Sequence, residues 1–235
     1  MRQSSCTVKS EPIIVVDNFY DDPHKKREDA LSCAYDAGGS YPGMLSVKRF
    51  HVDEAMKKIE AILGTEVRWD PSTANGCFRF SLASDASSHR DIHTDAMEAE
   101  SPFPQWGGVC YLSLPKDCQG GTSFWRHNQT GLQKKPTPKE QAKVGGMVKI
   151  PNTPEAVGKY FKQEGLDRSR WKEVKRVQMV FNRLALFQPN LFHSHTSNFG
   201  ETRENGRLTQ LFFFDEVDYF IKMVMSHEIK VDHYR

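Results

Sequence analysis

The sequence lacks a long apolar run, a strong excess of one charge and an even set of cysteines. No run of about 18 apolar residues occurs in the 235-residue chain, which argues against a membrane span. The segment 1–10 is polar and contains no apolar signal core. With 32 basic and 30 acidic residues the formal net charge is only +2, so charge offers no case for nucleic acid as a partner.

The five cysteines form an odd set without a Cys-x-x-Cys pair. This pattern argues against a disulfide framework and against a thiolate zinc site, and it favours reduced thiols in the cytosol. We therefore expect a soluble, cytoplasmic protein. The length fits one domain, which we expect to span residues 1–235.

Helical patterns are concentrated in the first third of the chain. A β-branched run at 12–19 predicts a strand, and Asp22-Pro23 then opens a predicted helix that extends to about residue 37. Apolar residues at helical spacing predict a second helix over 52–63, which Gly64 ends. We expect this helical N-terminal part to cover about 12–65.

From residue 76 onward, short β-rich runs are separated by Gly, Pro and Asn turns. They lie at 77–84, 108–114, 122–127, 177–181, 183–188 and 207–215. A charged helical insert interrupts them at about 136–174, with a helix predicted at 154–163 and a solvated stretch at 134–143. The pattern predicts a mainly β protein with flanking α-helices and a β core at about 76–215.

A candidate metal site is formed by His93, Asp95 and His193. In a strand, residues i and i+2 point to the same side, so the His93 imidazole and the Asp95 carboxylate can converge on one cation. His193 follows the apolar pair Leu191-Phe192. Two histidines and one carboxylate form a facial triad with open positions, which suits iron(II) binding a chelating co-substrate together with dioxygen.

Two alternative ligand choices remain open. The segment His89-Arg90-Asp91 lies directly upstream and is the rival triplet. We favour His93 and Asp95 because Ile92 supplies an apolar flank next to His93. His195 has the same side-chain parity as His193 and is the alternative distal ligand. If it is not a ligand, His195 is a candidate base acting on substrate.

Arg207 opens the apolar run 211–214 and is the third element of the site. An arginine that points inward from an apolar strand is costly unless it meets a carboxylate, which its planar fork grips with two hydrogen bonds. Thr209 lies two residues on, faces the same way and can add a hydroxyl donor. The pair predicts a site for an acidic co-substrate.

The order of these motifs resembles the 2-oxoglutarate/iron(II)-dependent dioxygenase superfamily. The matching residues are His93-Thr94-Asp95, the glycine-rich turn 120–124, His193 and Arg207-Leu208-Thr209. The resemblance implies a double-stranded β-helix (a jelly roll, cupin-like). It also implies Fe(II), 2-oxoglutarate and dioxygen as cofactors, and a hydroxylation or related oxidation that releases succinate and CO2. The retained Asp95 disfavours halogenation.

A closer resemblance, to the DUF6445 type of small oxygenase-like proteins, rests on three segments. These are VVDNFY at 15–20, Tyr41-Pro42-Gly43 and GGTSFWRHNQTG at 120–131. The family name implies no substrate. The distance from His193 to Arg207 is a few residues longer than in prolyl hydroxylases, which leaves Arg203 as an alternative partner of the co-substrate.

Four residues are candidates for lining the substrate site. Phe124 and Trp125 follow the Gly-Gly turn, Tyr41 lies on a Pro-Gly loop, and Arg79 interrupts an apolar strand. We expect a small-molecule substrate, with an amino-acid derivative as one candidate. The alternatives are an oxygenase that acts on a protein side chain, a metal-binding jelly roll that uses no 2-oxoglutarate, and a non-catalytic one.

Overall fold

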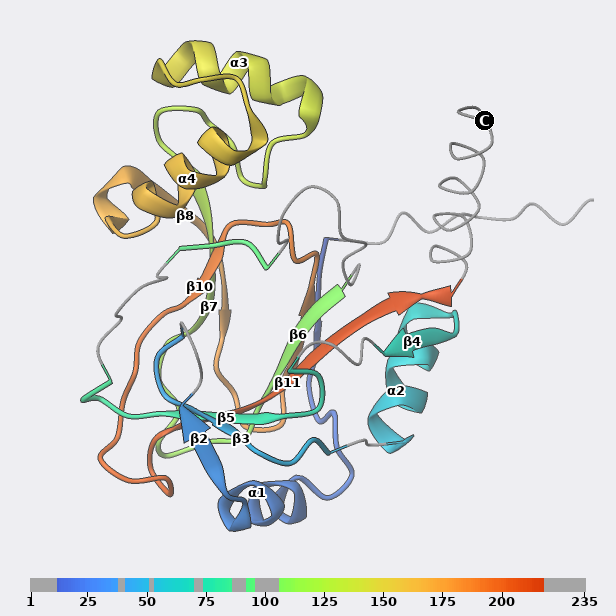
Figure 1. Cartoon of the computed structure of the whole chain (residues 1–235). Helices are drawn as coiled ribbons and strands as arrows, with labels where there is room; N and C mark the ends of the chain where they lie inside the picture. The colour runs from blue at the N-terminus through green and yellow to red at the C-terminus, as the bar shows by residue number, and fades with distance from the viewer. Residues whose placement is uncertain are drawn as a thin grey trace, which may run out of the picture.

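A computed structural model describes residues 12–37, 41–50, 53–69, 74–85, 92–95 and 106–217. Within these ranges the chain forms two antiparallel β-sheets with helices packed against them (Figure 1). The prediction of a mainly β protein with flanking helices is therefore confirmed. None of the helices in the described ranges has the length and apolar character needed to cross a membrane.

The larger sheet has eight strands in the order β1-β9-β6-β11-β5-β3-β2, with β4 pairing β11 off this path. Its long central strand, β11 (Arg207–Glu216), pairs with both β5 and β6. The other strands are β1 (Ile13–Val16), β2 (Tyr35–Ala37), β3 (Met44–Ser46), β4 (Val67–Trp69), β5 (Phe78–Ser81), β6 (Trp106–Tyr111) and β9 (Leu184–Phe187).

The smaller sheet has the order β10-β7-β8, with β10 at His193–His195, β7 at Gly121–His127 and β8 at Trp171–Gln178. Side chains alternate between the faces of a strand, so each sheet has one face toward the other. Tyr111 and Phe187 of the larger sheet form one buried cluster with Phe124 and Val177 of the smaller sheet. The two sheets therefore pack face to face as a sandwich.

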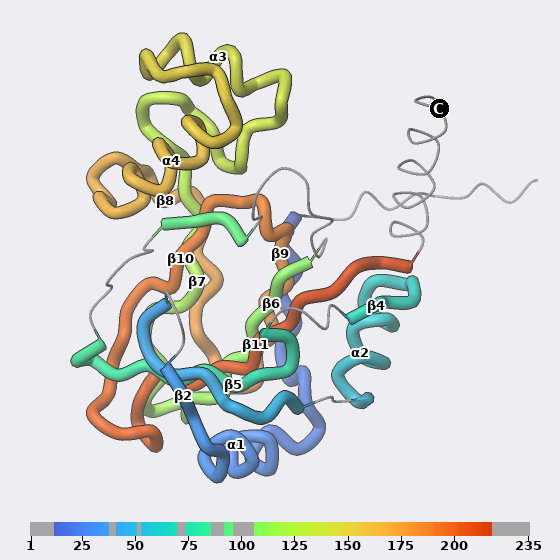
Figure 2. Tube along the Cα trace, in the orientation of Figure 1, coloured from blue at the N-terminus to red at the C-terminus, as the bar shows by residue number. Residues whose placement is uncertain are grey.

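Helices α1 (Pro23–Ser32) and α2 (Asp53–Leu63) cover the outer face of the larger sheet (Figure 2). Their small and apolar residues Ala30, Ala55 and Ile59 are fully buried in one cluster with Phe80 and Phe212 of the sheet. Burial of such a cluster stabilises the fold at about 25 cal/mol per Å² of apolar surface removed from water.

The helical insert lies against one end of the smaller sheet and consists of α3 (Pro138–Val148), α4 (Pro154–Glu164) and the 3-10 helix η1 (Arg168–Arg170) (Figure 1). Phe161 of α4 packs with Trp171 and Phe192 in a third buried cluster. The fully buried His127 of β7 bonds through Nε2 to a carboxylate oxygen of Glu164, 3.0 Å away. The insert is thus fastened to the smaller sheet by apolar packing and by a buried polar contact.

Several expected boundaries are wrong. The first helix ends at Ser32, because residues 35–37 form β2 and pair with β3. The stretch 134–143 is mostly exposed, as expected, but it contains the start of α3, whose capping box joins Thr137 and Glu140. The helical insert ends before residue 174, because β8 begins at Trp171.

Candidate metal centre

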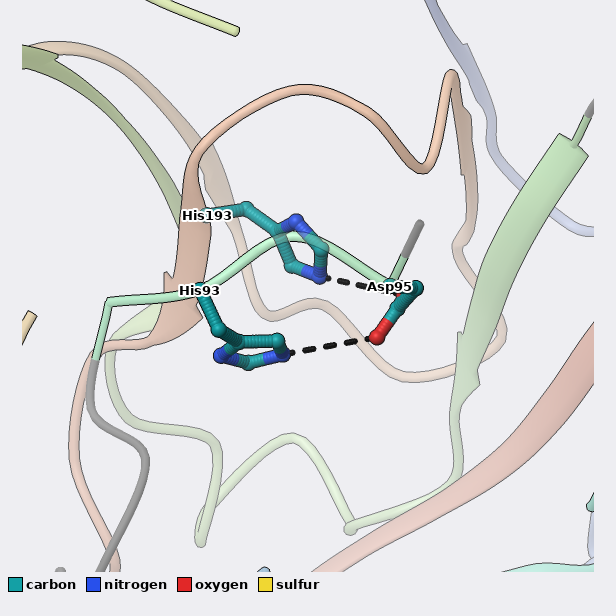
Figure 3. A group of neighbouring side chains, drawn as sticks. All are labelled: His93, Asp95 and His193. Atoms are coloured by element: carbon teal, nitrogen blue, oxygen red, sulfur yellow. Dashed lines mark ion pairs between the residues drawn. The ribbon is translucent and has the colours of Figure 1, made fainter. Parts of the chain in front are cut away.

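The backbone brings His93 and His193, which are far apart in the sequence, into direct contact. The amide of each residue donates to the carbonyl of the other, at 3.0 Å from His93 and 2.8 Å from His193. The Asp95 amide donates to the carbonyl of Pro189 at 2.8 Å. The segment 92–95 is therefore attached to the chain around β10 at two points, which places all three side chains together (Figure 3).

The three side chains present ligand atoms that lie within 4.8 Å of one another. Nε2 of His93 is 3.5 Å from Oδ1 of Asp95, and Nε2 of His193 is 3.3 Å from Oδ2 (Figure 3). Nδ1 of His193 lies 2.8 Å from the Leu191 carbonyl oxygen, which can only accept. In the neutral imidazole Nδ1 must therefore carry the proton, which leaves Nε2 with a lone pair for a metal.

The electrostatics of the group keep Asp95 ionised. Burial by itself raises the pKa of Asp95, but the facing imidazoles of His193 and His93 lower it by a larger amount. The pKa of Asp95 therefore lies well below its usual range. Burial lowers the pKa of His193 and the facing carboxylate raises it, with a net upward shift. The group thus combines an anionic oxygen ligand with two imidazoles, the donor set of a facial triad.

Aromatic side chains surround the group. The rings of Phe187 and Phe124 lie with their centroids 4.6 Å and 6.4 Å from that of His193. The Tyr41 ring lies edge-to-face at 5.0 Å from His93, and its hydroxyl is 3.4 Å from Oδ1 of Asp95. Two of the predicted substrate-site residues, Tyr41 and Phe124, are therefore beside the candidate ligands.

Arg207 is buried without an ionic partner in the described part of the chain. Arg207 is 7% exposed, its Nε has no hydrogen-bond partner among the described residues, and no carboxylate of those residues shifts its pKa. The guanidinium lies over the Tyr111 ring at 5.7 Å, and burial lowers the pKa of Arg207. Thr209 is also buried, and its hydroxyl donates to the Arg79 carbonyl at 3.4 Å.

His195 lies on the same face of β10 as His193, and its imidazole is neutral. Burial lowers the pKa of His195 to about 3, and the positive charges of Arg207 and Arg168 lower it too. Since His93 also acts on this pKa, His195 lies within electrostatic range of both His93 and Arg207.

Arg79 lies on the inner face of β5, where its guanidinium is 5.3 Å from the Tyr41 ring centre and donates to the Pro42 carbonyl at 3.2 Å.

Trp125, by contrast, faces away from the metal centre. Its indole donates to Ser194 at 3.0 Å, and it packs in the cluster beneath the helical insert. Of the two aromatic residues after the Gly-Gly turn, only Phe124 remains a substrate-site candidate.

The alternative Arg203 lies on the other side of the larger sheet. Its guanidinium is 5.0 Å from the Tyr35 ring and 5.3 Å from the Phe80 ring, in the outer core beside α1. This position leaves Arg207 as the inward-facing arginine of the pair. The segment His89-Arg90-Asp91 lies outside the described residues.

Sequence reasoning did not single out two contacts of the site. One is the Leu191 carbonyl, which orients His193. The other is Gly165, whose carbonyl accepts from the Ile92 amide at 3.0 Å, directly before His93. Every residue has a backbone carbonyl, so no residue type in the sequence marks one that acts as an acceptor. In the sequence, Gly165 indicates only the end of a helix.

The fold and the site together define a mainly β protein with a candidate His-Asp-His metal centre. The chain belongs to the family described as "Family of unknown function (DUF6445)", whose model matches residues 1–214. The resemblance to that family inferred from the sequence is therefore confirmed. No curated protein matches the chain.

Several solved structures are similar at low identity. HygX from Streptomyces hygroscopicus, with nickel, 2-oxoglutarate and hygromycin B bound, is 9% identical, with a TM-score of 0.47 over 88% of this chain and 83% of that one. A prolyl hydroxylase from Trichoplax adhaerens, in complex with a peptide fragment, is 13% identical, with a TM-score of 0.45 over 87% and 84%. An N-substituted L-amino acid dioxygenase from Burkholderia ambifaria AMMD is 15% identical, with a TM-score of 0.36 over 86% of each chain.

Proposed function

We propose that this protein is an Fe(II)- and 2-oxoglutarate-dependent oxygenase. The observation that carries the proposal is the combination of a His-Asp-His group with the buried Arg207, which has no carboxylate partner among the described residues. A His-Asp-His group alone suits several metal ions, and a buried arginine alone suits many anions. Together they match a cofactor pair in which an iron ion and a dicarboxylic acid bind side by side.

The donor set fits iron(II). Two imidazole nitrogens and one carboxylate oxygen occupy one face of a metal ion and leave the remaining positions for other ligands. The proton on Nδ1 of His193 is held by the Leu191 carbonyl, so Nε2 is oriented before any metal binds. His93, Asp95 and His193 are accordingly the proposed ligands.

Arg207 fits the distal carboxylate of 2-oxoglutarate. Burying an unpaired guanidinium costs several kcal/mol, and a bidentate carboxylate offsets that cost. The orphaned Nε of Arg207 is the type of donor that such a carboxylate would satisfy. Thr209 lies on the same face of β11, where its hydroxyl can turn from the Arg79 carbonyl to the co-substrate.

When bound, iron(II) and 2-oxoglutarate supply the oxidising chemistry, in which dioxygen is consumed and succinate and CO2 are released. The chain's own part is to bind and orient. His93, Asp95 and His193 hold the metal, and Arg207 with Thr209 holds the co-substrate. The rings of Phe187 and Phe124 exclude water beside His193.

We further infer that the two sheets are the layers of a double-stranded β-helix and that the chain forms one oxygenase domain. A small molecule is the proposed substrate, and hydroxylation is the proposed outcome. Tyr41, Phe124, Arg79 and His195 are the proposed residues around that substrate. The rings of Tyr41 and Phe124 contact the candidate ligands, and Arg79 and His195 lie within electrostatic range of Arg207.

The test is to add iron(II) and then 2-oxoglutarate to metal-free protein under nitrogen, and to record the visible charge-transfer band of the chelate. We expect the band in the wild type and its alteration or loss in Asp95→Ala. In Arg207→Ala the band should need roughly tenfold to a hundredfold more 2-oxoglutarate, because hydrogen bonds to charged groups contribute about 1.5–3 kcal/mol.

Arg126→Ala is the matched control, because the Arg126 side chain on β7 is exposed and should leave the titration unchanged. If the wild type binds iron but develops no band, 2-oxoglutarate is excluded as the co-substrate. The protein would then be a metal-binding protein of another kind. Failure of the wild type to bind iron would show that the triad is not a metal site.

A further inference from the structure

Tyr41 contacts two of the three proposed ligands at once. Its ring lies edge-to-face against the His93 imidazole, with centroids 5.0 Å apart. Its hydroxyl donates to Oδ1 of Asp95 over 3.4 Å. Tyr41 and Asp95 are separated by 54 positions in the sequence, so the contact is created by the fold and not by a local turn.

The two oxygens of Asp95 have different neighbours. Oδ2 faces Nε2 of His193 at 3.3 Å, whereas Oδ1 faces both Nε2 of His93 and the Tyr41 hydroxyl. A facial triad needs only one oxygen from its carboxylate. A hydroxyl that engages Oδ1 therefore biases the carboxylate toward binding through a single oxygen and keeps a second metal position open.

The backbone around Tyr41 is held in place by contacts with β5. Gly43 has a φ of +82°, and a Cβ there would lie 2.1 Å from the Phe80 carbonyl, so no side chain can be accommodated. Arg79 donates to the Pro42 carbonyl and lies over the Tyr41 ring. The phenol is thus presented to Asp95 by a segment that packs directly on the sheet.

We propose that Tyr41 is a positioning residue of the metal centre, whose hydroxyl orients the Asp95 carboxylate so that it binds the metal through one oxygen. This inference rests on the proposed function. It extends that function by assigning to Tyr41 a role toward the metal, separate from any contact with substrate. Partners of metal ligands typically contribute tenfold to a hundredfold to metal affinity.

The test compares wild type, Tyr41→Phe and Tyr160→Phe with cobalt(II) alone as the probe. Tyr41→Phe keeps the ring against His93 and Arg79 and removes only the hydroxyl. Tyr160→Phe is the matched control, because its hydroxyl donates to Gln129 in the region of the helical insert, at 3.0 Å. Cobalt affinity is measured by competition with a chelator, and the visible absorption of bound cobalt reports its coordination number.

We expect Tyr41→Phe to bind cobalt tenfold or more weakly and with altered visible bands, while Tyr160→Phe matches the wild type in both. Unchanged affinity and bands in Tyr41→Phe would overturn the inference. So would weaker binding with unchanged bands, since a general loosening of the fold produces that result. The proposed function is tested separately by the wild type. If the wild type binds cobalt and forms the 2-oxoglutarate chelate, the proposed function stands even when the inference about Tyr41 fails.

Discussion

Gly165→Ala is the substitution that most directly tests how the helical insert supports the metal centre. Gly165 directly follows α4, and its carbonyl accepts from the Ile92 amide at 3.0 Å. A Cβ added at Gly165 would lie 2.1 Å from the Ile92 carbonyl oxygen. Since Ile92 precedes His93, a methyl group at this position must push the metal-binding segment away from α4.

The expected size of the effect follows from these distances. Non-bonded heavy atoms rest at about 3.5–4.0 Å, so Gly165 and Ile92 must separate by roughly 1 Å or more. Overpacking of this kind costs about 1–3 kcal/mol, and loss of the Ile92 hydrogen bond costs about 0.5–1.5 kcal/mol. If the displacement reaches His93, metal affinity should fall by about tenfold to a hundredfold, as for other supporting contacts.

Gly158→Ala is the matched control within α4. A Cβ at Gly158 has no atom within 4 Å, so the methyl group enters open space. In a helix interior the exchange should stabilise the protein by about 0.5–1 kcal/mol and leave metal affinity unchanged. The assay is a cobalt(II) titration against a chelator, combined with thermal unfolding of both variants. If Gly165→Ala remains folded and binds cobalt as the wild type does, the support of the metal segment by the insert is refuted.

Two further predictions concern the metal site and the attachment of the insert. Saturating cobalt(II), at about a hundredfold above its Kd, should stabilise the wild type by about 2.7 kcal/mol and raise Tm by roughly 5–10 °C. His193→Ala should abolish that shift, and an equal shift in the variant would contradict the assigned site. His127→Phe removes the buried bonds to Glu164 and Thr130 and should cost about 1–3 kcal/mol in a denaturant titration. A midpoint equal to that of the wild type would mean that apolar packing alone fastens the insert.

Much of the candidate site could be predicted from the sequence because its rules are local. Side-chain parity places His93 and Asp95 on one side of the chain, and the structure brings both together with His193. The same parity places Arg207 and Thr209 on one face of β11, and both residues are buried. Short-range geometry and residue chemistry are sufficient for inferences of this kind.

Other features depended on contacts between distant parts of the chain. Parity requires Phe124 and Trp125 to face opposite ways, but it does not determine which of them faces the metal centre. Packing of Trp125 in one buried cluster with Val157 and Phe161 of the helical insert decides that Trp125 faces away from the metal centre. The early end of α1 has a similar cause, because pairing of β2 with β3 competes with helix formation after Ser32.

The sequence by itself determined the candidates for the metal ligands and for the arginine that meets a carboxylate, because charge, donor type and strand parity are properties of a few neighbouring residues. Only the tertiary structure decided that Tyr41 reaches Asp95 and that Gly165 supports Ile92. These contacts join segments 54 positions apart in the first case and 73 apart (165 minus 92) in the second. Their formation depends on the packing of whole sheets and helices, whose free energy is spread over the entire core.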